Sequence, residues 1–339
     1  MTSLGPIFAD DLARIKPGDR LRLTISAQTS DAAALAQAAL EARARGERVL
    51  VVCADPADVP RLAQEMPWFE PKLDVRPLPD WETLPYDVLS PQEELVSERL
   101  EALYRLTAPT GGADVLLTSA VTASQRLSPV SYIGANTFFF HQGEQISLTT
   151  LQKRLAAAGY ANVKQVLAAG EFAVRGSIVD VFPMGSERPF RLDFFDDEIE
   201  SIRWFDVDTQ RSMESAEEIR LLPGHEFPVD PEALLAFRQR WRREFAGDPK
   251  KSIVYCDIEK EILPPGIEYY LPLFFDETAA LTDYLPPNAR VFLLGDIEAA
   301  LQAFGRDMAS RYKVLAADPQ RPALAPERIW LKPEEFFKS

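Results

Sequence analysis

The chain has 339 residues, of which 46% are hydrophobic, so it can bury a sizeable core, and its length corresponds to two or three domains. Its formal net charge of -15 argues against a broad nucleic-acid footprint, because duplex binding relies on lysine and arginine to neutralise phosphates. The amino terminus shows no secretory signal, and no apolar run approaches the ~20 residues that span a bilayer. We therefore expect a cytoplasmic protein with no membrane partner.

The first third of the chain alternates apolar strands with amphipathic helices. Strands are predicted at 21–25, 48–54, 73–78 and 114–119, and helices at 31–45, 56–66 and 91–106. Continuous apolar strands that alternate with such helices indicate a parallel sheet covered on both faces. This region is therefore predicted to be a doubly wound α/β domain.

The first strand-to-helix turn is where nucleotide-binding domains of this type carry the phosphate loop GxxxxGK[ST]. Here the turn is residues 24–31, TISAQTSD, which has no glycine and no lysine, and Asp31 would place a carboxylate where a triphosphate sits. We expect Ser30 or Asp31 to cap the following helix instead. Nucleotide binding is therefore not expected from the degenerate loop, which includes Thr24, Ala27, Thr29 and Ser30.

The segment DWETLPYD at 80–87 places acidic residues near Trp81 and Tyr86, which suggests either acid/base catalysis or base stacking. Catalytic carboxylates need a pocket and shifted pKa values, which a sequence does not show. Packing of the two rings under a proline-rich loop is the favoured interpretation, so no catalytic residue is assigned.

Two cysteines and two histidines are spread along the chain. Cys53 lies in a predicted buried strand and Cys256 stands alone, while His141 and His225 are far apart in sequence. None of them has the spacing of a metal site, so neither a disulfide framework nor a zinc site is expected.

A change of composition near residue 131 marks a second unit. A strand is predicted from 137 to 140 and a helix at 147–159, capped by Ser147 or Thr149. Residues 170–212 then form a predicted three-stranded antiparallel meander, with strands at about 172–182, 189–195 and 198–206 and turns at 183–186 and 196–197. Together they predict a compact α+β module inserted into the α/β domain.

The middle strand of this meander alternates between two faces, because strand side chains point to opposite sides in turn. One face takes Phe190, Leu192 and Phe194, and the other takes Arg191, Asp193 and Phe195. An aromatic ring beside arginine is typical of protein-binding hot spots. The alternative is that a neighbouring helix buries Phe195 while Arg191 pairs with Asp193 in solvent.

After residue 223 the α/β pattern returns, with a helix at 231–245, a short strand at 251–257, a strand at 290–295 and a helix at 296–312 that Asp296 begins. The first helix carries a basic cluster of Arg238, Arg240, Arg242 and Arg243. Such a cluster is usually a solvated face, and DNA contact is the alternative. The proline-rich, aromatic segment at 262–275 receives no role from the sequence.

Several segments resemble one family. The run GEFAVRGSIVDVFPMGSERPFRLDFFDDEIESIRWFDVDTQRS at 170–212 closely resembles the same part of the bacterial transcription-repair coupling factor, Mfd, and more loosely a domain of the excision-repair subunit UvrB. The segments DWETLPYD, QRLSP at 125–129 and HEFP at 225–228 and the stretch 90–100 also look like Mfd. The match is collinear over nearly the whole chain.

The resemblance implies the amino-terminal, UvrB-like part of that family. Its fold would be a degenerate P-loop domain, RecA- or helicase-like and doubly wound, in two parts at 1–133 and 222–339. The inserted module at 134–221 would bind UvrA by mimicking UvrB, and so recruit it to RNA polymerase stalled at a lesion, in transcription-coupled nucleotide excision repair. The family's UvrA-contacting positions correspond to Arg175, Arg191, Asp193 and Phe195.

For the full-length parent, the resemblance implies an ATP-dependent DNA translocase whose motor uses ATP and Mg. RNA polymerase and DNA would be bound through regions absent here, and a carboxy-terminal domain would cover the UvrA-binding surface until the motor engages. This chain, which ends without a capping element, is expected to be a fragment with no enzymatic activity and no cofactor. Residues 86–93 are too few for UvrB's DNA-clamping hairpin. The alternatives are a nucleotide-hydrolysing helicase-like domain and a DNA-contacting module.

Overall fold

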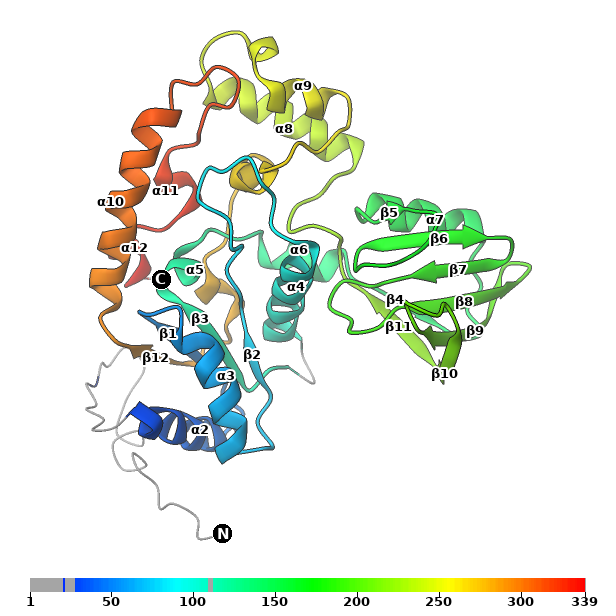
Figure 1. Ribbon diagram of the computed structural model, residues 1–339, viewed down its shortest axis with the longest axis horizontal. Coiled ribbons are helices and arrows are strands. Elements are labelled where there is room, and N and C mark those ends of the chain that lie inside the picture. The colour runs from blue at the N-terminus through cyan, green and yellow to red at the C-terminus, as the bar shows by residue number, and fades with distance from the viewer. Residues whose placement is uncertain (1–20, 22–27, 109–111, 339) are drawn as a thin grey trace.

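The computed structural model describes residue 21, residues 28–108 and residues 112–338 (Figure 1). Most of the predicted strand at 21–25, from residue 22 on, and the part of the degenerate loop before residue 28 therefore lie outside the described residues. None of the helices in the described ranges combines the length and the apolar composition needed to cross a bilayer.

A four-stranded parallel sheet organises the body of the molecule. Its order is β12-β1-β3-β2, with bounds Arg290–Leu294, Val49–Cys53, Val115–Ser119 and Val75–Pro77. The late strand β12 pairs in parallel with β1, from Val49 opposite Arg290 to Cys53 opposite Leu294. Segments from both ends of the chain therefore share one sheet, and the predicted α/β class is confirmed.

Helices cover both faces of this sheet, as the continuous apolar strands predict. They are α2 (Gln28–Ala44), α3 (Asp58–Phe69), α4 (Glu93–Thr107), α5 (Ala120–Ser124), α6 (Val130–Ala135) and α10 (Ile297–Leu315). Val51 packs with Leu62 and Met66 of α3, whereas Val52 belongs to the core that includes Leu301 of α10. Asp296 caps α10 as expected, accepting from the Ala299 N–H at 3.0 Å.

The expectation that Ser30 or Asp31 caps the first helix is wrong for Asp31. Helix α2 begins at Gln28, so Asp31 lies inside its first turn rather than at the cap. The Arg61 guanidinium donates to both carboxylate oxygens of Asp31, at 3.0 and 2.7 Å. The carboxylate therefore ties α2 to α3.

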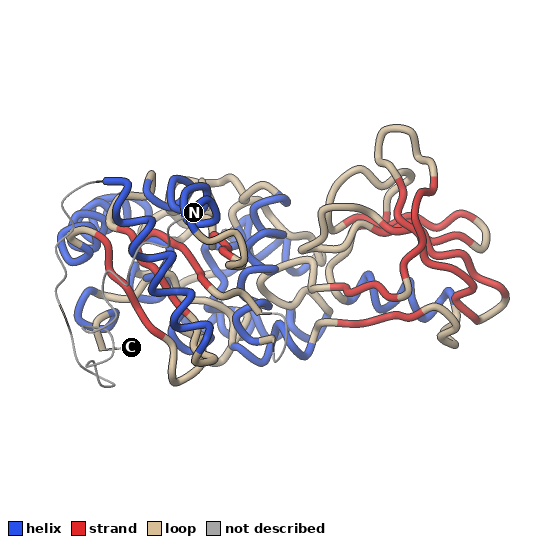
Figure 2. Tube along the Cα trace, turned by 90° about the horizontal axis from the view of Figure 1, so that it is seen from below, coloured by secondary structure: helices blue, strands red, loops and turns tan. Residues whose placement is uncertain are grey.

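The module at the side of the body contains most of the antiparallel structure (Figures 1 and 2). Its six-stranded sheet has the order β10-β9-β8-β7-β6-β5, and a separate pair joins β4 to β11. The bounds are β4 Phe138–His141, α7 Leu148–Ala157, β5 Ala161–Asn162, β6 Glu171–Arg175, β7 Ile178–Val181, β8 Phe190–Phe195, β9 Glu198–Phe205, β10 Ser212–Ala216 and β11 Glu218–Leu221. Ser147 caps α7 as predicted, accepting from the Thr150 N–H.

The predicted first strand of the meander, 172–182, is in fact two strands. Arg175 ends β6, Gly176 has a φ of +64°, and Ile178 begins β7, so the chain reverses at Gly176-Ser177. A glycine in the left-handed region followed by serine is a hairpin signal inside an otherwise apolar run. The two later turns lie where the sequence predicts them.

The region after the module is mainly helical. Its elements are α8 Pro231–Glu244, η1 Pro249–Lys251, α9 Ile253–Glu259, η2 Ile267–Leu273, η3 Leu281–Tyr284, α11 Pro326–Ile329 and α12 Pro333–Phe336. The predicted strand at 251–257 is wrong, because α9 occupies it. Ser252 caps this helix, and Val254, Tyr255 and Ile258 share its buried face at helical spacing.

The structure explains the aromatic segment at 262–275. The 3₁₀-helix η2 is buried along its length and forms the centre of a second core, with Trp81, Phe237, Trp241 and Trp330 around it. Gly266 begins it with a φ of +78°, and a side chain there would come within 2.5 Å of the Asp87 carbonyl oxygen. The segment therefore forms the centre of the hydrophobic core of the helical region.

The module is held firmly against the body. The Tyr160 hydroxyl donates to the Leu222 carbonyl at 2.8 Å, and the Gly185 N–H donates to Ser97 Oγ of α4 at 2.7 Å. Arg220 pairs with Glu101 of α4 and lies over the Tyr104 ring, 4.5 Å from its centroid. One apolar cluster runs from the module into the body.

His225 lies in the segment that leaves the module. Its ring stacks on Phe227 with centroids 5.4 Å apart, and a side chain at Gly159 would come within 2.8 Å of it. Burial lowers the pKa of His225 to about 4, since the charged form loses hydration. The folded protein therefore holds this imidazole neutral.

We predict that His225 makes folding less favourable as the pH falls from about 6.5 to 4. Over this window the unfolded chain takes up the proton and the folded chain does not, so stability falls by roughly 2 kcal/mol. Urea unfolding of the parent and of His225→Phe at several pH values measures this as the difference between two pH profiles. Glu268, whose pKa burial raises to about 7, titrates in both proteins and so cancels. Parallel profiles would contradict the prediction.

A candidate protein-binding face

The four predicted site residues lie on the outer side of the six-stranded sheet. In β8 the buried residues are Phe190, Leu192 and Phe194, so the predicted alternation is confirmed. Register places Arg175 opposite Ile178 and Ile178 opposite Asp193, while the next row holds Asp180 opposite Arg191. Arg175, Arg191 and Asp193 therefore lie close together, and we call this surface the outer face.

Asp180 is the centre of the outer face and is not among the residues that the sequence predicts for the site. Its side chain is 0% exposed, yet two arginines reach it. Arg191 donates from Nε and Nη2 to its two oxygens at 2.6 and 2.9 Å, and Arg175 donates to Oδ2. An acidic residue within the apolar run Ile178–Val181 was the available signal, because a buried carboxylate requires a partner.

Arg191 is fully engaged within the module. Besides Asp180, its Nη1 donates to the Gln210 carbonyl at 3.1 Å and to Ser212 Oγ at 3.2 Å, and its guanidinium lies 5.0 Å from the centroid of the Phe205 ring. The hydrogen bonds from Arg191 to Asp180 raise the pKa of the guanidinium. Its side chain is 15% exposed, so it contributes more to holding the face than to free contact area.

The alternative interpretation, in which a helix buries Phe195 and Arg191 pairs with Asp193, does not match the structure. Asp193 accepts a hydrogen bond from Ser201 Oγ at 3.1 Å, and Arg191 pairs with Asp180. A register shift between Asp193 and Phe194 re-aims the end of β8. Phe195 follows it with 69% of its surface exposed, so no helix buries it.

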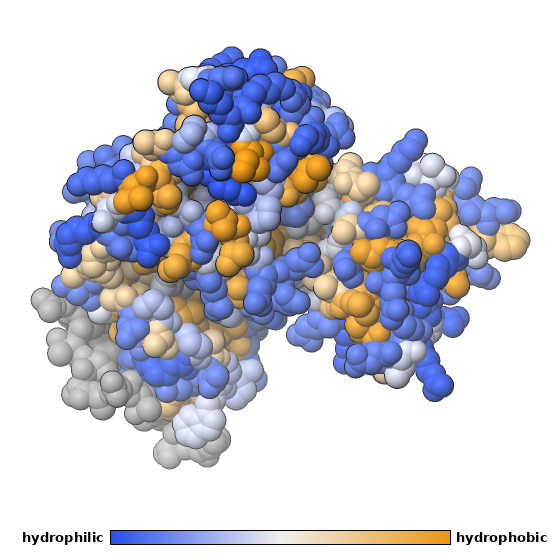
Figure 3. Space-filling model, turned by 45° about the horizontal axis from the view of Figure 1, so that its top comes forward, coloured by the Kyte–Doolittle hydropathy of each residue, from blue (hydrophilic) through white to orange (hydrophobic). Residues whose placement is uncertain are grey.

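The outer face therefore combines a rigid charged centre with a free aromatic ring. Hydrophobic side chains also reach the surface of the module in Figure 3. Exposed aromatic rings beside ordered, hydrogen-bonded arginines are suited to docking a protein surface.

The arginine cluster of α8 is used inside the molecule. Arg238 lies 3.6 Å from Glu259, Arg240 pairs with Asp276 at 2.6 Å, and Arg242 lies over the Tyr255 ring at 5.5 Å. Arg242 and Arg243 are exposed, as the solvated-face interpretation expects, and the ion pairs of Arg238 and Arg240 leave less charge for phosphate.

The segment at 80–87 packs as expected. Trp81 is buried, and its indole N–H donates to Glu226 Oε1 at 3.1 Å. Tyr86 donates to the Leu324 carbonyl at 2.9 Å, and burial raises the pKa of its hydroxyl. Both rings therefore belong to the helical core, which confirms the packing interpretation.

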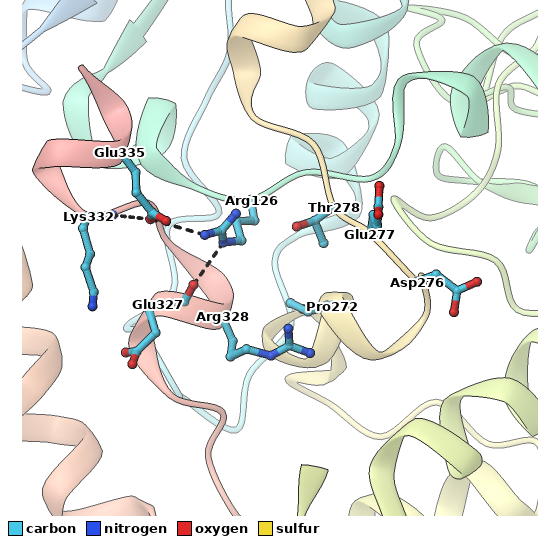
Figure 4. A pocket seen from close by; sticks show the side chains of 9 residues that line it. All are labelled: Arg126, Pro272, Asp276, Glu277, Thr278, Glu327, Arg328, Lys332 and Glu335. Carbon is cyan, nitrogen blue, oxygen red and sulfur yellow. Dashed lines mark hydrogen bonds and ion pairs between the residues drawn. The ribbon is translucent and has the colours of Figure 1, made fainter. Parts of the chain in front are cut away.

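A cavity beside α11 and α12 has a volume of about 540 Å³ (Figure 4). Arg126 in its wall donates to Glu335 at 3.3 Å and to the Glu327 carbonyl at 3.0 Å, and Arg328 pairs with Glu244. Both arginines of the wall are thus engaged in contacts within the protein. Within the described ranges no cluster of histidine, cysteine and carboxylate side chains could hold a metal, and Cys53 and Cys256 are free thiols.

We predict that Arg191→Ala destabilises the protein. The substitution leaves the buried Asp180 carboxylate with Arg175 alone, and losing one partner of a buried pair costs about 3 kcal/mol. Urea unfolding measures the loss. Arg203→Ala is the matched control, because Arg203 lies opposite Arg191 on β9 but is exposed, and we expect a change within about 0.5 kcal/mol. Equal stability of the two variants would show that the pair is unimportant.

Comparisons with known proteins agree with this organisation. The model of the UvrB interaction domain family matches residues 138–227. The transcription-repair-coupling factor of Escherichia coli is 42% identical over 290 residues, covering 85% of this chain and 25% of the relative. That of Haemophilus influenzae is 45% identical over 265 residues, covering 77% and 23%, and that of Bacillus subtilis is 32% identical over 216 residues, covering 59% and 18%.

The chain spans about a quarter or less of the length of these relatives. The matched domain range contains β4 to β11, and with them every residue of the outer face. The resemblance found in the sequence is confirmed: residues 138–227 are a UvrB interaction domain, and most of the chain is related to a part of the bacterial transcription-repair-coupling factors.

Proposed function

We propose that the chain is the amino-terminal, UvrB-like part of a transcription-repair-coupling factor and that its module recruits UvrA. The observation that carries the proposal is the outer face, where Phe195 is free beside the ordered Arg175, Asp180 and Arg191, within a UvrB interaction domain. The longer protein would bring UvrA to a stalled RNA polymerase in transcription-coupled nucleotide excision repair. A cytoplasmic location belongs to the same proposal.

The residues of the outer face would have different roles in binding UvrA. Phe195 would enter a pocket of UvrA as the desolvated anchor, because exposed aromatic rings supply most binding energy at such interfaces. Arg175, which is half-exposed, and Asp193 would make charge-assisted hydrogen bonds across the interface. Arg191 would keep the face in shape through Asp180.

We further propose that the body descends from a P-loop domain and no longer binds nucleotide. The ion pair of Asp31 with Arg61 supports this, because both side chains tie helices together next to the degenerate loop. ATP and Mg would act in the motor of the longer protein. DNA and RNA polymerase would likewise be bound by other parts of the longer protein. The carboxy-terminal domain that covers the outer face would be one of those parts.

We predict that Phe195→Ala weakens binding to UvrA by about 30-fold or more, which corresponds to ~2 kcal/mol for a hot-spot side chain. Calorimetric titration of purified UvrA measures the change. The variant should unfold at the same urea concentration as the parent, since Phe195 is exposed. This separates it from Arg191→Ala, which would lose both stability and binding.

Trp68→Ala is the matched control for that experiment. Trp68 is an exposed aromatic residue on α3, in the body, and its removal should leave UvrA binding unchanged. If Phe195→Ala and the parent bind equally, the docking surface is elsewhere. If the parent does not bind UvrA at all, the proposed function is wrong.

We predict no binding of ATP with Mg²⁺ to this chain at concentrations up to ~1 mM, because the turn at 24–31 offers neither glycine N–H groups nor a lysine. Calorimetry of the parent and of Asp31→Ala tests this, with a P-loop ATPase as the positive control. The variant removes the carboxylate and should still not bind. Micromolar affinity in the parent would instead favour the helicase-like alternative.

A further inference from the structure

Another cavity lies in the body and has a volume of about 180 Å³. Its wall includes Asp80, which follows β2, and Val121 and Thr122 of α5, which follows β3. It therefore opens at the carboxyl ends of parallel strands, where α/β sheets bind ligands. A cavity of roughly 150 Å³ accommodates a benzene ring, so this one has room for an aromatic group.

Aromatic rings from distant parts of the chain form the walls. Trp81 and Tyr269 meet edge to face with centroids 5.4 Å apart, and Phe304 of α10 meets Trp330 in the same way at 5.3 Å. The polar atoms of the first pair are already used, since Trp81 donates to Glu226 and the Tyr269 hydroxyl bonds with Thr83. The rings thus supply apolar surface to the cavity.

Gln125 is the amide side chain in the wall. It is 5% exposed, and its Oε1 accepts from Arg99 at 2.9 Å. With the oxygen engaged, its Nε2 is the group that can donate. Gln125 therefore provides a hydrogen-bond donor for whatever enters the cavity.

The loop that forms the remaining wall is held in an unusual backbone conformation. Glu82 has a φ of +54° and Tyr86 a φ of +66°, values in the left-handed region that non-glycine residues rarely adopt. Hydrogen bonds from Tyr86 to Leu324 and from Tyr269 to Leu84 keep the loop in place. Strain retained in this way is common at binding sites, where it fixes the shape of the wall in advance.

The charge around the cavity discriminates between occupants. Among the residues that the structure describes, no lysine or arginine lines it, and the Asp80 carboxylate in its wall is exposed, two residues from the exposed Glu82. The Asp80 carboxylate accepts from Thr122 Oγ1 at 2.9 Å and from the Glu82 N–H at 3.0 Å, so it is fixed in position. The nearby Arg99 guanidinium is already paired with Glu226. A nucleotide would therefore bring phosphate to a wall that offers it no free cation in the described part of the chain, whereas a basic peptide would be attracted to the carboxylates.

The loop that contributes to the wall also exposes apolar side chains. Leu84, Val88 and Leu89 of the same loop are all exposed. A protein segment that inserts one ring could rest its neighbouring residues on them, and patches of this kind mark interaction sites. These contacts lie in the body, away from the outer face of the module.

We propose that this cavity is a docking site for a protein segment that inserts an aromatic side chain and carries a basic residue next to it. The ring would lie between the aromatic walls, a main-chain carbonyl of the segment would accept from Gln125, and the basic group would face Asp80 and Glu82. The site is independent of UvrA docking.

Fluorine NMR of protein labelled with 5-fluorotryptophan tests the proposal. The chain has 5 tryptophans, and Trp81 and Trp330 line the cavity whereas Trp68, Trp204 and Trp241 do not. L-Tryptophanamide, a cationic indole, is the probe. We expect it to shift the signals of Trp81 and Trp330 saturably and to leave the other three unchanged, with at least fivefold weaker effects from the anion N-acetyl-L-tryptophan.

Adenosine and AMP are the competing probes. If either shifts the two cavity signals at a lower concentration than tryptophanamide, the occupant is a nucleotide and the proposal is wrong. If tryptophanamide shifts no signal, or shifts only Trp68, the cavity takes no aromatic group and the proposal is likewise wrong.

Two variants localise the effect. Val121→Phe places a ring in the cavity and should weaken tryptophanamide binding at least tenfold, while Val314→Phe, at an exposed position of α10, should not. Asp80→Asn should remove most of the preference for the cation over the anion, and it tests the site even if Val121→Phe fails to fold. UvrA binding should be unchanged in Asp80→Asn, which separates this proposal from the proposed function.

Discussion

The buried ion pair between Arg99 and Glu226 connects the parts of this molecule. Arg99 is fully buried in α4, and its Nε lies 2.6 Å from Glu226 in the segment that leaves the module. The same guanidinium donates to the Pro79 carbonyl and to Gln125, and Glu226 accepts from Trp81. Because an uncompensated charge at this depth would cost several kcal/mol, the strand ends, α4 and the module exit must stay together. The placement of the module and the shape of the small cavity both depend on this pair.

The sequence predicts most of the fold where the burial of an element follows a regular pattern. The strands at 49–53 and 115–119 are buried on both faces and read as apolar runs, and β8 alternates as expected. The failures have local causes. The reversal at Gly176 interrupts a run whose residues all favour strands. The segment of α9 is rich in β-branched and aromatic residues, which favour strands, but Ser252 caps it and the packing of Tyr255 and Ile258 makes it a helix.

The candidate site shows a different limit. Resemblance identifies Arg175, Arg191, Asp193 and Phe195, but it assigns all four to the interface and does not reveal Asp180. Strand register sets that residue opposite Arg191, and register depends on the unrecognised hairpin. The structure therefore separates the charged pair that maintains the face from the ring that is free to make contact. The sequence does not predict the aromatic cavity, because its walls come from residues 81, 269, 304 and 330, which are far apart in the chain and share no local sequence pattern.

The pairing of β12 with β1 has a consequence for synthesis on the ribosome. Val49 and its partner Arg290 are separated by about 240 residues, so the sheet of the body stays incomplete until β12 has been made. At typical translation rates β1 lacks its partner β12 for roughly 10 to 50 s after it has been made. The module has its contacts close in sequence and can fold during that time. The nascent chain therefore has a folded module before it has a folded body, and in that interval the open edge is the part that chaperones would need to protect.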